Sequence, residues 1–95
     1  MYSQWMRRIE RRLFVINDEI ESLEESLRLV EEELTFHQHL NDDAQRDAVV
    51  SGNPLDRSDA RQTGGDVRRF ERNLMQIRQR KAALQAKRDR LVKRL

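Results

Sequence analysis

The chain has 95 residues, enough for one domain, and its formal net charge is only +2. Charged residues make up 38% of the sequence and aromatic residues 5%, a composition typical of long helices and coiled coils and unlike a mixed globular fold. The absence of cysteine excludes disulfide bonds and thiolate metal sites, and no apolar run approaches the roughly 20 residues of a membrane span. The N-terminal residues lack the apolar region of a signal peptide, so the expected location is the cytoplasm.

The first predicted element is a helix from about residue 3 to about residue 44. Its apolar residues alternate steps of three and four positions over five heptads, which places them along one seam of a helix. The seam consists of Tyr2, Met6, Ile9, Leu13, Ile16, Ile20, Leu23, Leu27, Val30, Leu34 and His37. It then weakens to Asn41, Ala44 and Ala48. A repeat of this kind predicts a coiled coil with a partner helix.

A flexible connector is predicted next, from about residue 45 to about residue 65. Residues 51–54, Ser-Gly-Asn-Pro, are typical of a turn, and Asn53 is suited to cap a short helix. The adjacent glycines at 64–65 each disfavour a helix by about 1 kcal/mol relative to alanine. We therefore expect the helix to be interrupted there, with Asp66 as the N-cap of the next one.

The second long helix is predicted from about residue 66 to about residue 94. Its seam is weaker and consists of Val67, Phe70, Leu74, Ile77, Lys81, Leu84, Arg88, Leu91 and Leu95. Residues 17–34 carry a net charge of −7 and residues 66–95 a net charge of +8, which favours pairing of the two helices within one chain. The sequence thus predicts a single all-α domain over residues 1–95, an antiparallel two-helix coiled-coil hairpin. Because such a hairpin buries little surface, a second copy or another protein is expected to complete it to a four-helix bundle.

Two registers of the hairpin keep apolar layers together, and the sequence leaves both open. In one register the numbers of facing residues sum to 104, which pairs Leu34 with Phe70 and favours apolar burial. In the other they sum to 111, which pairs Leu34 with Ile77 and gives more attractive charge pairs, among them Glu33 with Arg80. Each exposed charge pair contributes only a few tenths of a kcal/mol.

A second apolar face is predicted on the first helix, away from the seam. It consists of Trp5, Val15, Leu29, Phe36 and Leu40, most of them at heptad spacing. A simple two-stranded seam does not need these residues, so they favour an interface with a second copy, offset so that basic residues approach the other copy's acidic stretch. The preferred interpretation is a non-enzymatic protein–protein interaction or adaptor module that forms a homodimer or binds another protein.

A basic pole supports the first alternative, binding of nucleic acid or ribonucleoprotein. Either register brings the basic residues of the N-terminal stretch and of the C-terminus to the same end of the hairpin. The candidates are Arg7, Arg8, Arg11, Arg12, Lys87, Arg88, Arg90, Lys93 and Arg94. Arginine suits contacts with phosphate, and the nearby Trp5 could stack on a base.

The second alternative starts from Asp42, Asp43 and Asp47 in the predicted connector. Carboxylates at a coiled-coil tip are similar to those of the transcript-cleavage factors of bacterial RNA polymerase, although these 95 residues hold no counterpart of the second, globular domain of those factors. His37 and His39 are two positions apart and would point in different directions, so no metal site is expected. With no catalytic motif either, we expect no catalytic residues, no cofactor and no small-molecule substrate.

Overall fold

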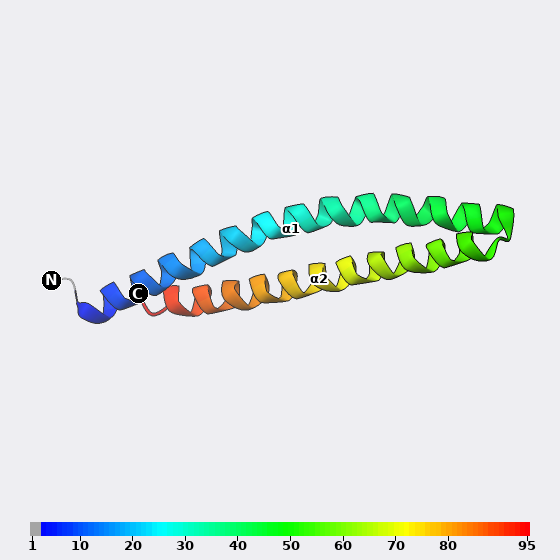
Figure 1. The fold of residues 1–95 in the computed structure, drawn as a ribbon. Coiled ribbons are helices and arrows are strands. Elements are labelled where there is room, and N and C mark those ends of the chain that lie inside the picture. Colours follow the sequence, from blue (N-terminus) through cyan, green and yellow to red (C-terminus); the bar gives the residue numbers. More distant parts are fainter. Residues whose placement is uncertain (1–2) are drawn as a thin grey trace. The chain divides into compact units, whose positions relative to one another are not determined.

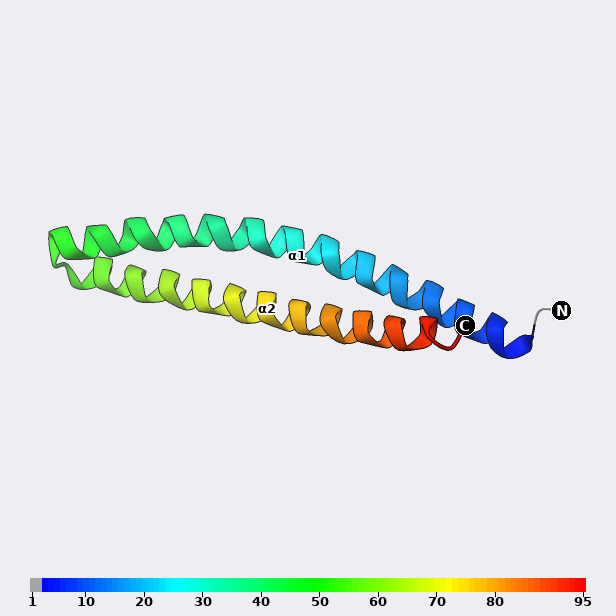
Figure 2. The ribbon, with the colours of Figure 1, turned by 180° about the vertical axis from the view of Figure 1, so that it is seen from behind.

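The computed structural model describes residues 3–95, which form two long helices packed as a hairpin (Figures 1 and 2). Helix α1 spans Gln4–Ser51 and α2 spans Pro54–Val92, with no strand among the described residues. The predicted all-α helical hairpin is therefore confirmed, while Tyr2 of the predicted seam lies outside the described residues. No helix in this part of the chain is long and apolar enough to cross a membrane.

The two helices are joined by a turn of only two residues, Gly52 and Asn53. Gly52 has a φ of 62°, and its N–H donates to the carbonyl of Ala48 at 3.0 Å, which ends α1 in the left-handed conformation common at helix C-termini. The Asn53 side chain then accepts a hydrogen bond from the Leu55 N–H at 2.8 Å and caps α2. Pro54 occupies the first helical position, where its missing N–H costs nothing. The predicted turn and the predicted cap are both confirmed.

The prediction of a long connector over residues 45–65 is wrong, because within this segment only Gly52 and Asn53 are not helical. The helix that begins at Pro54 continues through Gly64 and Gly65 to Val92. Asp66 is not an N-cap but an interior residue of α2 that pairs with Arg69 at 3.0 Å. Burial of Ala60 and Val67 on either side of the glycines shows that packing against α1 outweighs the low helix propensity of this segment.

The chain divides into two compact units, of which unit 1 consists of residues 1–27 and 76–95. Its core contains five buried residues from the two predicted seams: Ile9, Ile16, Ile20, Leu84 and Leu91. Leu13 and Leu23 pack against them. Full burial of a side chain of this size contributes roughly 1.5–3 kcal/mol, so this cluster is the main apolar contribution in unit 1. Leu95, also predicted in the seam, follows the end of α2 and is exposed.

Unit 2 consists of residues 28–75 and has fewer buried apolar side chains, those of Ala60, Val67 and Leu74. Next to them lies a polar layer in which the Thr63 hydroxyl donates to the Asn41 side-chain oxygen at 3.0 Å. The Gln45 amide donates to the Ala60 carbonyl at 3.4 Å. These hydrogen bonds join α1 and α2 where the predicted seam weakens.

Contacts in both units agree with the register in which facing residue numbers sum to 104. That register puts Asn41 opposite Thr63, its observed hydrogen-bond partner, whereas the sum of 111 would put it opposite Phe70. In unit 1, the Lys81 Nζ atom lies 3.5 Å from a carboxylate oxygen of Glu24. The numbers of these two residues sum to 105, one more than this register requires. Arg80 pairs with Glu19 at 2.9 Å, in place of Glu33, the partner that the sum of 111 requires.

Gly65 and Gly52 should respond in opposite ways to alanine substitution. Gly65→Ala should raise the free energy of unfolding by about 0.5–1 kcal/mol, because a Cβ there would meet only the Arg68 guanidinium, at 3.9 Å. Gly52→Ala should lower it by about 1–2 kcal/mol, because the positive φ disfavours a Cβ. Urea unfolding followed by circular dichroism at one protein concentration measures both. A destabilised Gly65→Ala would contradict a continuous α2.

Candidate interaction surface

The second apolar face predicted on the first helix is exposed in the structure, and we call it the outer face of α1. Each of its residues lies one position before, or two positions after, a residue of the α1 seam. The exposed fractions are 50% for Trp5, 65% for Val15, 48% for Leu29, 58% for Phe36 and 40% for Leu40. The α1 seam residues Met6 to Ala48, in contrast, are all buried or half-buried. Five large apolar side chains thus remain in water outside the hairpin core.

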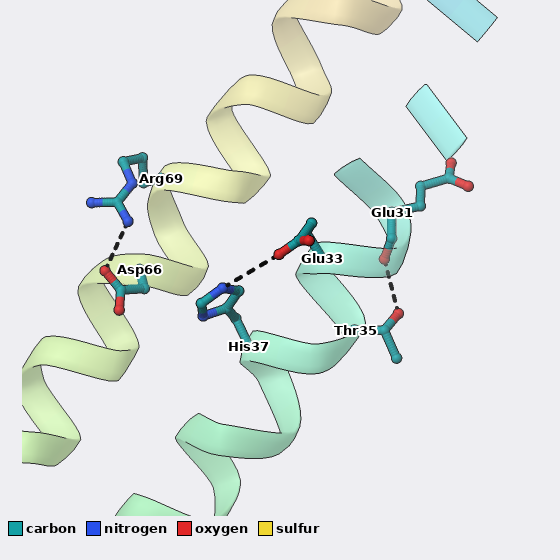
Figure 3. A network of polar contacts seen from close by, with 6 residues as sticks. All are labelled: Glu31, Glu33, Thr35, His37, Asp66 and Arg69. Atoms are coloured by element: carbon teal, nitrogen blue, oxygen red, sulfur yellow. Dashed lines mark hydrogen bonds and ion pairs between the residues drawn. The ribbon is translucent and has the colours of Figure 1, made fainter. Parts of the chain in front are cut away.

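Phe36 is held in place by an aromatic cluster that joins α1 to α2 within unit 2. The His37 ring stacks on Phe70 with ring centroids 4.6 Å apart, and Phe36 meets the edge of His37 at 5.5 Å. Figure 3 shows His37 pointing from α1 toward α2, with Glu33 beside it and the Asp66–Arg69 pair on the facing helix. The Nε2 atom of His37 lies 3.7 Å from Glu33, but its buried Nδ1 atom has no hydrogen-bond partner among the described residues.

Part of the predicted basic pole comes together in a groove of unit 1, which we call the basic groove. It is lined by Arg11, Arg12, Val15, Ile16 and Lys87. The structure therefore brings basic residues of both helices beside one residue of the outer face, Val15. The other basic candidates are not in this groove: Arg7 and Arg8 lie on the first turns of α1, Arg90 on the last turn of α2, and Lys93 and Arg94 beyond it. Arg88 occupies the α2 seam and is half-buried.

A second groove, in unit 2, is acidic and contains another residue of the outer face. This acidic groove is lined by Leu40, Asp43, Ala44, Asp47, Asp59, Gln62, Thr63 and Asp66. Asp42, Asp43 and Asp47 therefore belong to α1, and the two-residue turn itself carries no carboxylate. The acidic tip on which the likeness to transcript-cleavage factors rested is replaced by a groove along the hairpin.

Some exposed apolar residues were missed in the sequence because they lie in the segment assigned to the connector. Val49, Val50 and Leu55 flank the turn and are 84%, 87% and 67% exposed. Val50 lies two positions after the seam residue Ala48, which is the position that Val15, Leu29 and Phe36 occupy in their own heptads. Continuing the heptad count past residue 44 would have added it to the outer face.

Nothing among residues 3–95 forms a group of three or more histidine, aspartate or glutamate side chains that could hold a metal ion. Comparisons of the chain with protein-family models, with curated proteins and with solved structures found no match.

The two histidines allow a test of the aromatic cluster. His37→Leu should raise the free energy of unfolding by about 1 kcal/mol, because it removes a buried nitrogen without a partner and keeps an apolar contact with Phe70. The matched control His39→Leu, at an exposed position, should change it by less than about 0.5 kcal/mol. Urea unfolding of both variants gives the comparison. A clear loss of stability in His37→Leu alone would mean that its polar contacts stabilise the hairpin.

Proposed function

We propose that this chain is a protein–protein interaction module that self-associates through the outer face of α1. The observation that carries the proposal is the exposure of five large apolar side chains on a single helix. They occupy two heptad positions that neighbour each other around the helix. Isolated exposed apolar residues are normal on proteins, but a stripe at heptad spacing along a helix is typical of an interface. The proposed assembly is a coiled-coil homodimer with four helices.

The energetics favour association. Burying one side chain the size of leucine or phenylalanine stabilises by roughly 1.5–3 kcal/mol, and a two-fold interface uses each residue twice. Unit 2 gains most from a partner, because its own buried side chains are only Ala60, Val67 and Leu74. Phe36 and Leu40 lie in that unit and would add apolar burial where the hairpin core is weakest.

Substitution of the outer face should weaken self-association. In sedimentation equilibrium over micromolar concentrations, Phe36→Glu and Leu29→Glu should each raise the dimer dissociation constant at least tenfold, which corresponds to about 1.4 kcal/mol. Phe14→Glu is the matched control, because Phe14 is 69% exposed but lies outside the outer face. A wild-type chain that stays monomeric at high micromolar concentration would refute self-association. The outer face would then be assigned as the binding surface for a different protein.

A second candidate function, nucleic-acid binding, is favoured by the basic groove. Arg11, Arg12 and Lys87 line one groove, so contributions from both helices could contact one phosphate backbone. Their position beside Val15 suits self-association equally well, and a net charge of +2 is low for a dedicated nucleic-acid binder.

Salt dependence distinguishes the two functions. If the groove makes three phosphate contacts with duplex DNA, the logarithm of the binding constant should fall with the logarithm of salt concentration with a slope of about −3. Fluorescence anisotropy with labelled generic DNA and RNA measures this slope, and Lys87→Ala should reduce its magnitude by about 1. No binding at low salt would eliminate this candidate.

A further inference from the structure

We infer that the partner on the outer face is a second copy in antiparallel orientation, with the basic groove of each copy seated on the acidic groove of the other. This inference rests on the proposed self-association and specifies its geometry. It would join unit 1 of one chain to unit 2 of the other, twice. The occupant of the acidic groove would therefore be the Val15 region of another copy, flanked by its arginines.

The two grooves have matching compositions. Each contains one outer-face residue, Val15 in the basic groove and Leu40 in the acidic groove. Each also takes charges of one sign from both helices: Arg12 and Lys87 on one side, Asp47 and Asp59 on the other. An apolar centre with charges around it is the usual anatomy of an interface, and the opposite signs would orient the two copies.

Residue spacing along α1 defines one register for the pairing. If two copies of α1 run antiparallel with Val15 facing Leu40, the numbers of facing residues add up to 55 throughout the helix. This register places Trp5 opposite Val50 and the small Ser26 opposite Leu29. It also brings together residues of opposite charge, Arg8 with Asp47 and Arg12 with Asp43.

Shifting the partner by one heptad in either direction loses this match. A sum of 62 sets Val15 against Asp47 and Glu19 against Asp43. A sum of 48 sets Leu29 against Glu19 and Val15 against Glu33. The register with Val15 on Leu40 also sets Phe36 against Glu19, but of the three registers it alone pairs two apolar side chains of the outer face with each other, so it is the one that the outer face favours.

The hairpin leaves the basic side of this match without acidic partners of its own. Among residues 3–95, Arg8, Arg12 and Lys87 form no ion pair. Asp43 pairs with Arg46 at 2.8 Å, but both side chains are more than two-thirds exposed, so this pair can be exchanged at little cost. The carboxylate of Asp47 lines the acidic groove without such a pair.

Reciprocal charge reversal tests the orientation. The acid-reversed variant carries Asp43→Arg and Asp47→Arg, and the base-reversed variant carries Arg8→Asp and Arg12→Asp. Each should raise its own homodimer dissociation constant at least 30-fold in sedimentation equilibrium, because residues 8 and 47, and residues 12 and 43, face each other between the two copies and would then carry charges of the same sign. An equimolar mixture should form heterodimers with an affinity within about fivefold of the wild type, since opposite signs meet again in both contacts.

A control separates this geometry from a general effect of charge. Asp18→Arg with Asp42→Arg changes the net charge by the same amount as the acid-reversed variant, at exposed positions outside the outer face, and should leave the affinity within about threefold. Circular dichroism of each variant shows whether the helices persist. A wild-type monomer would overturn the proposed function itself. A wild-type dimer that is disrupted by Phe36→Glu but not by either reversal, or a mixture that fails to associate, would overturn only the antiparallel arrangement.

A cross-link provides an independent measurement. The chain has no cysteine, so a single Ser26→Cys places one thiol per copy close to the proposed two-fold axis. Oxidation should link two copies, whereas Val50→Cys should not link to itself, because the two ends lie far apart in an antiparallel pair. Efficient self-linking of Val50→Cys would show parallel copies and overturn the inference.

Discussion

The two-residue turn at Gly52 and Asn53 is the constraint on which the remaining structure depends. A connection this short leaves α1 and α2 no freedom to slide, so it fixes which residues face each other across the hairpin. The hydrogen bond between Asn41 and Thr63 and the ion pair between Glu24 and Lys81 both agree with the register that the turn sets. The register in turn decides which side chains are buried and which charges remain at the surface.

Heptad spacing was sufficient to predict most of α1, because a 3.5-residue repeat of large apolar residues indicates a helix that packs along one seam against a partner helix. It failed after residue 44 for an identifiable reason. There the seam continues with Ala44, Ala48, Ala60 and Val67, and small side chains give a weak apolar signal although they allow close packing. Gly64 lies beside α1 in this arrangement, and a Cβ at its position would make an ordinary contact with the Asn41 side chain at 3.5 Å. Local propensity predicted a loop in this segment, whereas packing against α1 stabilises it as part of α2.

The candidate surface could be predicted only where it depends on a single helix. The exposure of Val15, Leu29 and Phe36 follows from their distance from the seam, whatever the register. The grooves depend on both helices, and the two registers left open by the sequence would have brought different α2 residues beside Arg12 or Asp47. Thus the basic pole was predicted as nine residues, while the structure gathers Arg11, Arg12 and Lys87 in one groove. The acidic groove was not predicted, because its Asp59 and Asp66 lay in or beside the supposed connector.

The distribution of charge suggests why this hairpin should not act alone. Opposite charges do pair across it, as Glu19 and Arg80 do, but the chosen register also gathers basic side chains of both helices in one groove and acidic ones in the other. Like charges in one groove oppose folding slightly, and a register set by apolar layers and a tight turn tolerates that cost. The same arrangement becomes favourable once a surface of opposite sign is available. A chain that carries both surfaces, each beside an exposed apolar side chain, provides that complement in its own second copy.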